Sequence, residues 1–381
     1  SANRSALEIE DALSRLGAQI DTEVGADAAV LSLITLSRFR DAALDLMSEI
    51  AARPRFDETE FERVRDLRLT RLRQMRDVAP AVADRMLARL LYPDHPYGHF
   101  PIGLARSLRA TSPGEVAAFH ASTWRPSRLT LIAVGDGTHD ELLAAAERAF
   151  GWWASDQAGN GEPEPPRAPA APAARLVIID RPGAAQTEMR IGTVAAPRVT
   201  PDYHALIVLN AVLGGQFVSR LNMNLREAKG YTYGVRSGFD FRRGPGPFIV
   251  QAAVQTAATA ESVREVLREA GAIAGEQPAT DAEIELARSS LTRGYPRNFE
   301  TSVQIARGLV QIALYGLPDD TLEQYVPSVE RVDAVSVTSA AQRLDPTRMT
   351  VALVGDRAQI APALAELGLG QPTVMTHDDL E

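Results

Sequence analysis

The fold of this chain is decided by the stretch Ser219-Arg220-Leu221-Asn222-Met223-Asn224-Leu225-Arg226-Glu227-Ala228-Lys229-Gly230-Tyr231-Thr232-Tyr233-Gly234-Val235. Its first half predicts a short helix whose apolar face carries Leu221, Leu225 and Ala228. Gly230 is expected to end this helix, because a left-handed helix terminus favours a residue without a Cβ atom. The sequence therefore predicts a helix, a glycine stop and a strand in direct succession.

The strand that follows has alternating residues, with Tyr231, Tyr233 and Val235 on one side. Arg226 comes off the end of the helix, and Tyr233 points off the strand. If the two side chains converge, a guanidinium group and a phenol face one oxygen atom, which suits an oxyanion or a peptide carbonyl. The alternative is purely structural: an Arg favoured by the helix dipole and a Tyr packed on a sheet.

This run resembles the C-terminal half of the pitrilysin-like zinc metallopeptidases, which include the insulin-degrading enzyme and the mitochondrial processing peptidase. The resemblance rests on Leu213-Gly214-Gly215, on Ser219-Arg220-Leu221, and on an Arg and a Tyr seven residues apart. It implies that Arg226 and Tyr233 are catalytic. The residues that it implies for substrate binding are Gly214, Gly215 and Ser219.

The composition is that of an ordinary globular protein. The chain has 381 residues, of which 45% are hydrophobic, and this length suggests two or three domains. Its net charge of −9 argues against nucleic acid or an anionic membrane surface as a partner. There is no apolar run of membrane-spanning length and no signal-like start. Cysteine is absent, which excludes disulfides and thiolate metal sites but leaves the redox compartment open.

An internal repeat predicts two copies of one domain. The segment Pro126–Asp136 recurs 220 residues later as Pro346–Asp356, and each copy reads as a buried strand that ends in a Gly-Asp turn. A Pro-initiated segment also precedes a helical pattern in both halves, at Pro54–Asp57 and Pro278–Asp281. We therefore expect an α+β fold built from two homologous layered α/β-sandwich domains.

The repeat also sets the expected domain boundaries. They are a first domain over 1–152, a Pro/Ala/Gly-rich linker over 153–174 and a second domain over 175–381. By the same offset the first copy is expected to begin about 45 residues before Ser1, so that the first domain lacks its N-terminal part. Within it we expect a helix over 3–17 with Leu7, Leu13 and Leu16 inward, strands within 20–35, and helices over 38–52, 58–76 and 82–91.

The zinc ligands of the resembled family are not found at their expected places. The family's His-x-x-Glu-His helix does not occur in this chain, and its place falls upstream of Ser1. A second helix of the family carries two Glu residues, which align with Val64 and Arg71. Arg cannot ligate Zn²⁺ and would repel it, so we expect no metal site in this chain. A shifted alignment would offer Glu60 or Glu62 instead.

The histidines have simpler interpretations. His95 and His99 have helical i, i+4 spacing, but the Pro and Gly between them predict a surface turn rather than a helix. His120 beside Phe119 is expected to be structural.

The resemblance implies a zinc-free subunit of a heteromeric zinc metalloendopeptidase. The expected partner is a homologous subunit that carries His-x-x-Glu-His and the zinc, and the expected substrate is a peptide, which exposed edge strands would bind by strand addition. Whether the chain is itself an enzyme stays open, and we expect it to be inactive alone. The alternatives are a structural scaffold, or a whole peptidase whose zinc motif lies upstream of Ser1. The expected location is the periplasm or cytoplasm of a bacterium, with the periplasm preferred.

Overall fold

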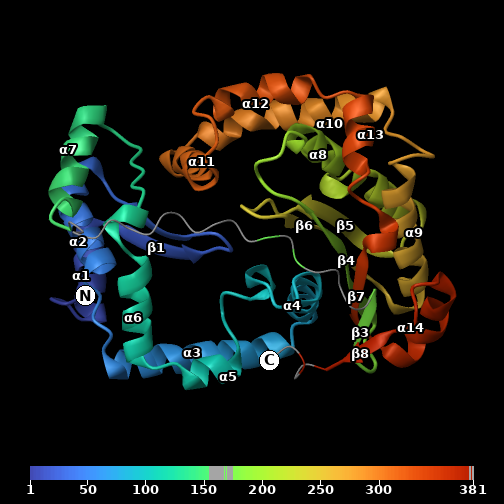
Figure 1. Ribbon diagram of the computed structural model, residues 1–381, viewed down its shortest axis with the longest axis horizontal. Helices are drawn as coiled ribbons and strands as arrows, with labels where there is room; N and C mark the ends of the chain where they lie inside the picture. The colour runs from blue at the N-terminus through green and yellow to red at the C-terminus, as the bar shows by residue number, and fades with distance from the viewer. Residues whose placement is uncertain (154–166, 168, 170–174, 377–378, 380–381) are drawn as a thin grey trace. The chain divides into compact units, whose positions relative to one another are not determined.

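The computed structural model describes residues 1–153, 167, 169, 175–376 and 379, and its contacts divide the chain into two compact units (Figure 1). Unit 1 comprises Ser1–Leu69, Ala105–Glu164 and Arg297–Leu317, and unit 2 comprises Thr70–Leu104, Pro165–Pro296 and Pro318–Glu381. The linker expected over 153–174 lies, except for Trp153, Arg167 and Pro169, outside the described residues. Each unit draws on both sequence halves, and the domain boundaries at 152 and 175 stay a prediction.

Unit 1 combines a short hairpin with helices. Strands β1 (Gln19–Val24) and β2 (Ala29–Ile34) pair antiparallel. The helices are α1 (Ala6–Leu16), α2 (Arg40–Ala52), most of α3 (Glu58–Arg76), α5 (Ala105–Ala110), α6 (Pro113–Thr123), α7 (His139–Phe150) and α11 (Ser302–Tyr315). The predicted strands within 20–35 and the predicted helices over 38–52 and 58–76 are therefore confirmed.

The core of unit 1 is small. Helix α2 packs on α7 and contributes Ala43, Leu46 and Met47, as its apolar periodicity predicts. Leu13 of α1 is buried, but the prediction that Leu7 faces inward is wrong, because Leu7 lies in the first turn of the helix and is 72% exposed.

Unit 2 contains a mixed sheet of six strands in the described part of the chain. Their order is β5-β6-β4-β7-β3-β8, so that β5 is one edge of the sheet. The strands are β3 (Leu176–Asp180), β4 (Gln186–Ala196), β5 (Thr232–Phe239), β6 (Gly246–Gln255), β7 (Thr350–Gly355) and β8 (Thr373–Met375). The helices are α4 (Ala79–Leu91), α8 (Tyr203–Asn210), α9 (Thr259–Ala272), α10 (Asp281–Gly294), α12 (Thr321–Glu330), α13 (Ala334–Ala341) and α14 (Arg357–Leu364).

Both faces of this sheet are covered, which gives unit 2 three layers (Figure 1). Along β3, Val177 and Ile179 pack against α4, whereas Leu176 and Ile178 face the larger core under α8 and α9. The period of two puts alternate side chains on opposite faces, and a strand buried on both faces is apolar throughout. The predicted α+β class is confirmed.

The repeated strand behaves differently in the two halves. The second copy is β7, which is buried along its whole length between β3 and β4. The first copy, over 129–134, follows a 3₁₀ turn just as β7 does, but the prediction of a buried strand is wrong, since these residues form no strand and are mostly exposed. A strand needs a hydrogen-bonding neighbour, and in the described part of unit 1 β1 and β2 pair only with each other.

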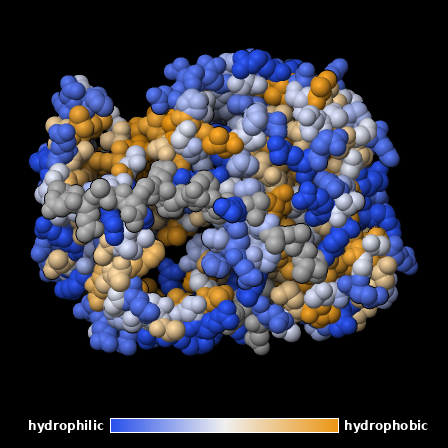
Figure 2. Space-filling view, viewed as in Figure 1, coloured by the Kyte–Doolittle hydropathy of each residue, from blue (hydrophilic) through white to orange (hydrophobic). Residues whose placement is uncertain are grey.

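The surface is mostly hydrophilic, with smaller apolar areas between the charged side chains on the visible face (Figure 2). Among the described residues no helix has both the length and the apolar character to cross a membrane.

Candidate functional site

The candidate site is a continuous segment of unit 2 that runs from α8 to β5. Helix α8 continues into a π-helical turn, Ala211–Gly215, which is followed by the loop 216–219 and a second π-helical segment, Asn222–Ala228. Gly230 then ends this helix with φ +64°, as predicted. π-Helical turns are rare and are frequently found at functional sites. Two of them flank one loop here.

The π-helical turn, which is wider than an α-helical one, explains why Ala228 does not lie on the buried face that the sequence predicts. Leu221 and Leu225 are buried, as predicted, but Ala228 is exposed. The amide of Lys229 donates to the carbonyl of Asn224, five residues back, so the residues after Leu225 are displaced from the α-helical face.

The predicted substrate-binding residues lie at the base of the loop. A Cβ atom on Gly214 would stand 2.5 Å from Ser237 Oγ, and one on Gly215 would stand 2.5 Å from Asn210 Nδ2. Ser219 is buried, and its hydroxyl lies 3.3 Å from Asn222 Nδ2. In this conformation all three residues shape the loop through close packing.

The buried side chain of Asn222 joins the helix to the strand. Its Nδ2 donates to Val235 O at 2.8 Å, and its Oδ1 accepts from Val235 N at 2.9 Å. The same Nδ2 lies 3.0 Å from the carbonyl oxygen of Gln216. Removal of this carboxamide would leave the backbone groups of Val235 without partners, at a cost of about 1–3 kcal/mol for each group. The sequence analysis assigned no role to Asn222. A polar residue that lies between two buried leucines, Leu221 and Leu225, does indicate a buried polar contact.

Tyr233 lies on a β-bulge. Thr232 is paired with Val254 of β6 and Val235 with Ala252, so two residues of β5 stand opposite one residue of β6. The predicted alternation is therefore wrong at this place: Thr232 and Val235 are buried, whereas Tyr233 and Gly234 are exposed. Tyr233 is 91% exposed, and within the described part of the chain its hydroxyl makes no hydrogen bond.

Arg226 lies at the surface end of the helix. Its side chain is 34% exposed, with Nε 3.4 Å from Glu227 Oε1. The guanidinium carbon lies 4.2 Å from the ring centroid of Phe217, which belongs to the loop. Within the described part of the chain no hydrogen bond or cation–π contact joins Arg226 to Tyr233, and Asn222 links the segments that carry them.

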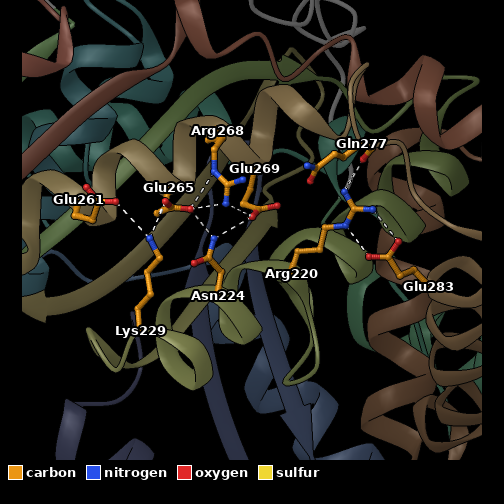
Figure 3. A network of polar contacts seen from close by, with 9 residues as sticks. All are labelled: Arg220, Asn224, Lys229, Glu261, Glu265, Arg268, Glu269, Gln277 and Glu283. Carbon is orange, nitrogen blue, oxygen red and sulfur yellow. Dashed lines mark hydrogen bonds and ion pairs between the residues drawn. The ribbon is translucent and has the colours of Figure 1, made fainter.

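A charged network fixes the outer side of the helix that carries Arg226 (Figure 3). Asn224 Nδ2 donates to Glu265 at 2.7 Å and to Glu269 at 3.0 Å, and Lys229 Nζ donates to Glu265 at 2.8 Å. Burial alone would raise the pKa of Glu265, but the hydrogen bonds from Lys229, Asn224 and Arg268 hold it at about 2. Glu265 is therefore ionised at any physiological pH.

Arg220 anchors the start of the same helix to α10. Its Nε and Nη2 donate to the two carboxylate oxygens of Glu283 at 2.6 and 2.7 Å, and Nη1 donates to Gln277 O at 2.6 Å (Figure 3). The hydrogen bond from Arg220 lowers the pKa of Glu283 to about 2. These residues line an open hollow of ≈ 630 Å³ together with Met223 and Asn224. Since the described charges around it are already paired, we interpret the hollow as structural.

The described residues do not offer a metal site. No group of three or more His, Asp or Glu side chains in the described part of the chain is placed to hold a metal ion. Val64 lies on α3 and is half-exposed, and Arg71 lies on the same helix. Neither a valine nor an arginine side chain can ligate Zn²⁺.

Two predictions about histidines are confirmed. His95 begins a 3₁₀ turn, Pro96–Gly98, in which its Nδ1 accepts from the amide of Tyr97 at 3.1 Å. His120 is structural, because its Nε2 lies 2.9 Å from Ala51 O and its ring stacks on Trp124.

Comparisons with known proteins agree with the fold and with this segment. The family described as "Peptidase M16 inactive domain" matches residues 111–291. A Mycobacterium tuberculosis protein described as an uncharacterized zinc protease is 28% identical over 357 residues, covering 92% of this chain and 80% of that protein. The Saccharomyces cerevisiae mitochondrial-processing peptidase subunit beta is 22% identical over 149 residues, covering 39% of this chain and 32% of its own length.

A solved structure extends this similarity to the fold. The peptidase M16 inactive domain from Pseudomonas fluorescens superposes with a TM-score of 0.85 at 25% identity, covering 93% of this chain and 84% of that one. The resemblance to the pitrilysin-like metallopeptidases is confirmed, and the chain is similar over most of its length to bacterial proteins described as zinc proteases.

Proposed function

We propose that this chain is the zinc-free subunit of a heteromeric zinc peptidase, in which Arg226 and Tyr233 act on the peptide at the zinc centre of a homologous partner subunit. The observation that carries the proposal is the exposure of Tyr233. A bulge lifts this residue out of the strand pairing, and its side chain is 91% exposed.

A structural role explains this arrangement poorly. A Tyr that stabilises a sheet buries its ring and gives its hydroxyl a partner, and Tyr233 does neither among the described residues. β-Bulges are common beside active sites, where they re-aim a side chain. The backbone on both sides of Tyr233 is nevertheless well fixed, since Thr232 and Val235 are buried.

The chemistry follows from the two functional groups. A phenol and a guanidinium group donate hydrogen bonds, and neither can ligate zinc in its ordinary charge state. Directed at a scissile carbonyl, they would orient it and stabilise the negative charge that develops on its oxygen. The partner's metal would supply the activated water. Loss of one such donor typically raises the barrier by about 2.7–4 kcal/mol, a factor of about 10² to 10³ in kcat.

Two further observations support the proposal. Positions Val64 and Arg71 cannot ligate zinc, which motivates the search for the metal in another chain. The yeast relative is named as a subunit of a processing peptidase, which supports an assembly of more than one chain.

The edge strand β5 provides a place for the peptide backbone. The backbone N–H and C=O groups of Val235 that point away from β6 bind Asn222. Because these groups alternate in direction along a strand, the N–H and C=O of Ser237 point to the same edge. An extended peptide would add to β5 from Ser237 onward, since Asn222 occupies the edge at Val235. The compartment, periplasm or cytoplasm, stays a prediction.

Reconstitution tests the proposal. The chain, a His-x-x-Glu-His homologue from the same organism, and their mixture are assayed for peptide hydrolysis, with assembly followed by gel filtration. We expect a complex and hydrolysis only in the mixture. Hydrolysis by the chain alone would support the whole-peptidase alternative. A complex with no gain over the zinc-bearing homologue would support the scaffold.

A further inference from the structure

We propose that Asn222 is the positioning residue that sets Tyr233 relative to Arg226. This inference rests on the proposed function, because it concerns how the two groups are held for the same reaction. Asn222 lies four residues before Arg226 on the π-helical segment, and its carboxamide binds both backbone groups of Val235, two residues after Tyr233.

The bulge leaves Tyr233 dependent on this contact. The ladder to β6 fixes β5 at Thr232, opposite Val254, and resumes at Val235, opposite Ala252. On the near side, Thr232 Oγ1 donates to Ala253 O at 2.6 Å and accepts from Gly234 N at 3.2 Å. On the far side, the outward groups of Val235 have Asn222 as their partner. Tyr233 is thus held between a contact to β6 and a contact to the helix of Arg226.

The same side chain also holds the loop beneath Arg226. Asn222 Nδ2 lies 3.0 Å from Gln216 O and 3.3 Å from Ser219 Oγ, on either side of Phe217. Phe217 carries the ring over which the Arg226 guanidinium lies. One carboxamide therefore connects the loop under Arg226, the helix of Arg226 and the strand of Tyr233.

The contact requires an amide in particular. Val235 offers one donor and one acceptor, and only a group with an acceptor oxygen and a donor nitrogen on one planar carbon matches both. Asn222→Asp keeps the shape and the acceptor for the Val235 N–H, but it replaces the donor to Val235 O and Gln216 O with an anionic oxygen. Asn222→Ala removes both contacts.

The test is a double-mutant cycle in the reconstituted complex, with kcat and KM measured separately. We expect Asn222→Ala and Asn222→Asp to lower kcat by about 10- to 100-fold with little change in KM, since a misplacement of about 1 Å can cost 10²-fold. In a Tyr233→Phe background the same changes should lower kcat by a clearly smaller factor, because the Tyr233 hydroxyl is already lost and only the placement of Arg226 remains to be disturbed. Thr187→Val is the matched control. It removes the buried hydrogen bond (2.9 Å) between Thr187, on β4 of the same sheet, and Thr259, the first residue of α9, and it should lower the Tm without changing kcat.

The cycle separates the two ideas. If Tyr233→Phe itself leaves kcat unchanged, the proposed function fails. If Tyr233→Phe lowers kcat, but Asn222→Ala lowers kcat by the same factor in the unaltered chain and in the Tyr233→Phe chain, the positioning role of Asn222 is overturned and the proposed function stands.

Amide hydrogen exchange provides a readout without activity. We expect the amide of Val235 to be protected in the unaltered chain and to exchange at least about tenfold faster in Asn222→Ala, which removes its acceptor, whereas the amide of Val250 in β6 stays protected. Fast exchange of Val235 in the unaltered chain would overturn the proposal even if neither variant folds.

Discussion

The guanidinium group of Arg226 lies over the aromatic ring of Phe217, with its central carbon 4.2 Å from the ring centroid. The ring is 62% exposed, so it adds little to the core. It does provide a face on which a cation is stabilised. An exposed aromatic ring beneath a half-buried cation is explained by a function at the surface more readily than by a contribution to folding.

The ring of Phe217 is expected to matter for catalysis and not for stability. Phe217→Ala should lower kcat/KM of the reconstituted complex by about two- to fivefold, because a cation–π contact at an exposed site contributes about 0.5–1 kcal/mol. Phe217→Tyr keeps the aromatic face and should retain activity. Thermal unfolding of both variants should match the unaltered chain within about 0.5 kcal/mol. A Phe217→Ala complex with full activity would show that the ring does not hold Arg226 in place.

Gly214 is expected to be required by packing. A Cβ atom at this position would stand 2.5 Å from Ser237 Oγ and 3.0 Å from Leu221 Cδ1, and Ser237 is itself fixed by a 2.7 Å hydrogen bond to Asn210. Gly214→Ala should therefore lower the free energy of unfolding by about 1–3 kcal/mol, measured by urea denaturation.

The control for this change is Gly294→Ala, at the end of α10, where a Cβ atom has no neighbour within 4 Å. That variant should be unchanged or more stable by up to about 1 kcal/mol. Equal effects of the two substitutions would contradict the close approach of Gly214 to β5.

The network around Glu265 predicts a stability difference that depends on pH. Its pKa is about 2 in the folded chain, against an ordinary value of 4.5, so the unfolded chain binds the proton more tightly. The contribution of this carboxylate is therefore complete above about pH 5 and is lost as the pH falls towards 2. Glu265→Gln should destabilise the chain at pH 7, and the difference from the unaltered chain should shrink steadily below pH 5.

The measurement is urea denaturation of both chains at a series of pH values. Glu323→Gln, at an exposed carboxylate of α12, serves as the control and should show no such trend. A Glu265→Gln difference that is constant from pH 7 to pH 3 would mean that the ionised carboxylate does not stabilise the fold.

Local patterns were enough to predict much of the fold. The charged and apolar periodicity of 58–76 predicted α3, and the glycine after Lys229 predicted a left-handed helix terminus, because each depends on neighbours within a turn. The strand over 129–134 was predicted wrongly for the opposite reason. It has the same pattern as β7, but a strand is completed by residues distant in sequence.

The site was predicted only in part for a similar reason. The spacing of Arg226 and Tyr233 was visible in the sequence, but the bulge that exposes Tyr233 depends on pairing with β6 and on Asn222, which lies 13 residues from Val235. The π-helical turn after Leu225 likewise changes which residues share a face of the helix, and the helix propensities of the residues do not predict it.

The central claim is that Arg226 and Tyr233 act together on one oxygen atom of the substrate. The most direct test is steady-state peptide hydrolysis by the reconstituted complex with Arg226→Ala, Tyr233→Phe and the double variant, with assembly checked by gel filtration. We predict that assembly is retained, that each single variant lowers kcat by about 10²-fold, and that the double variant loses less than the product of the two. A double variant that assembles and hydrolyses the peptide at the unaltered rate would contradict the claim and leave a scaffold as the function of this chain.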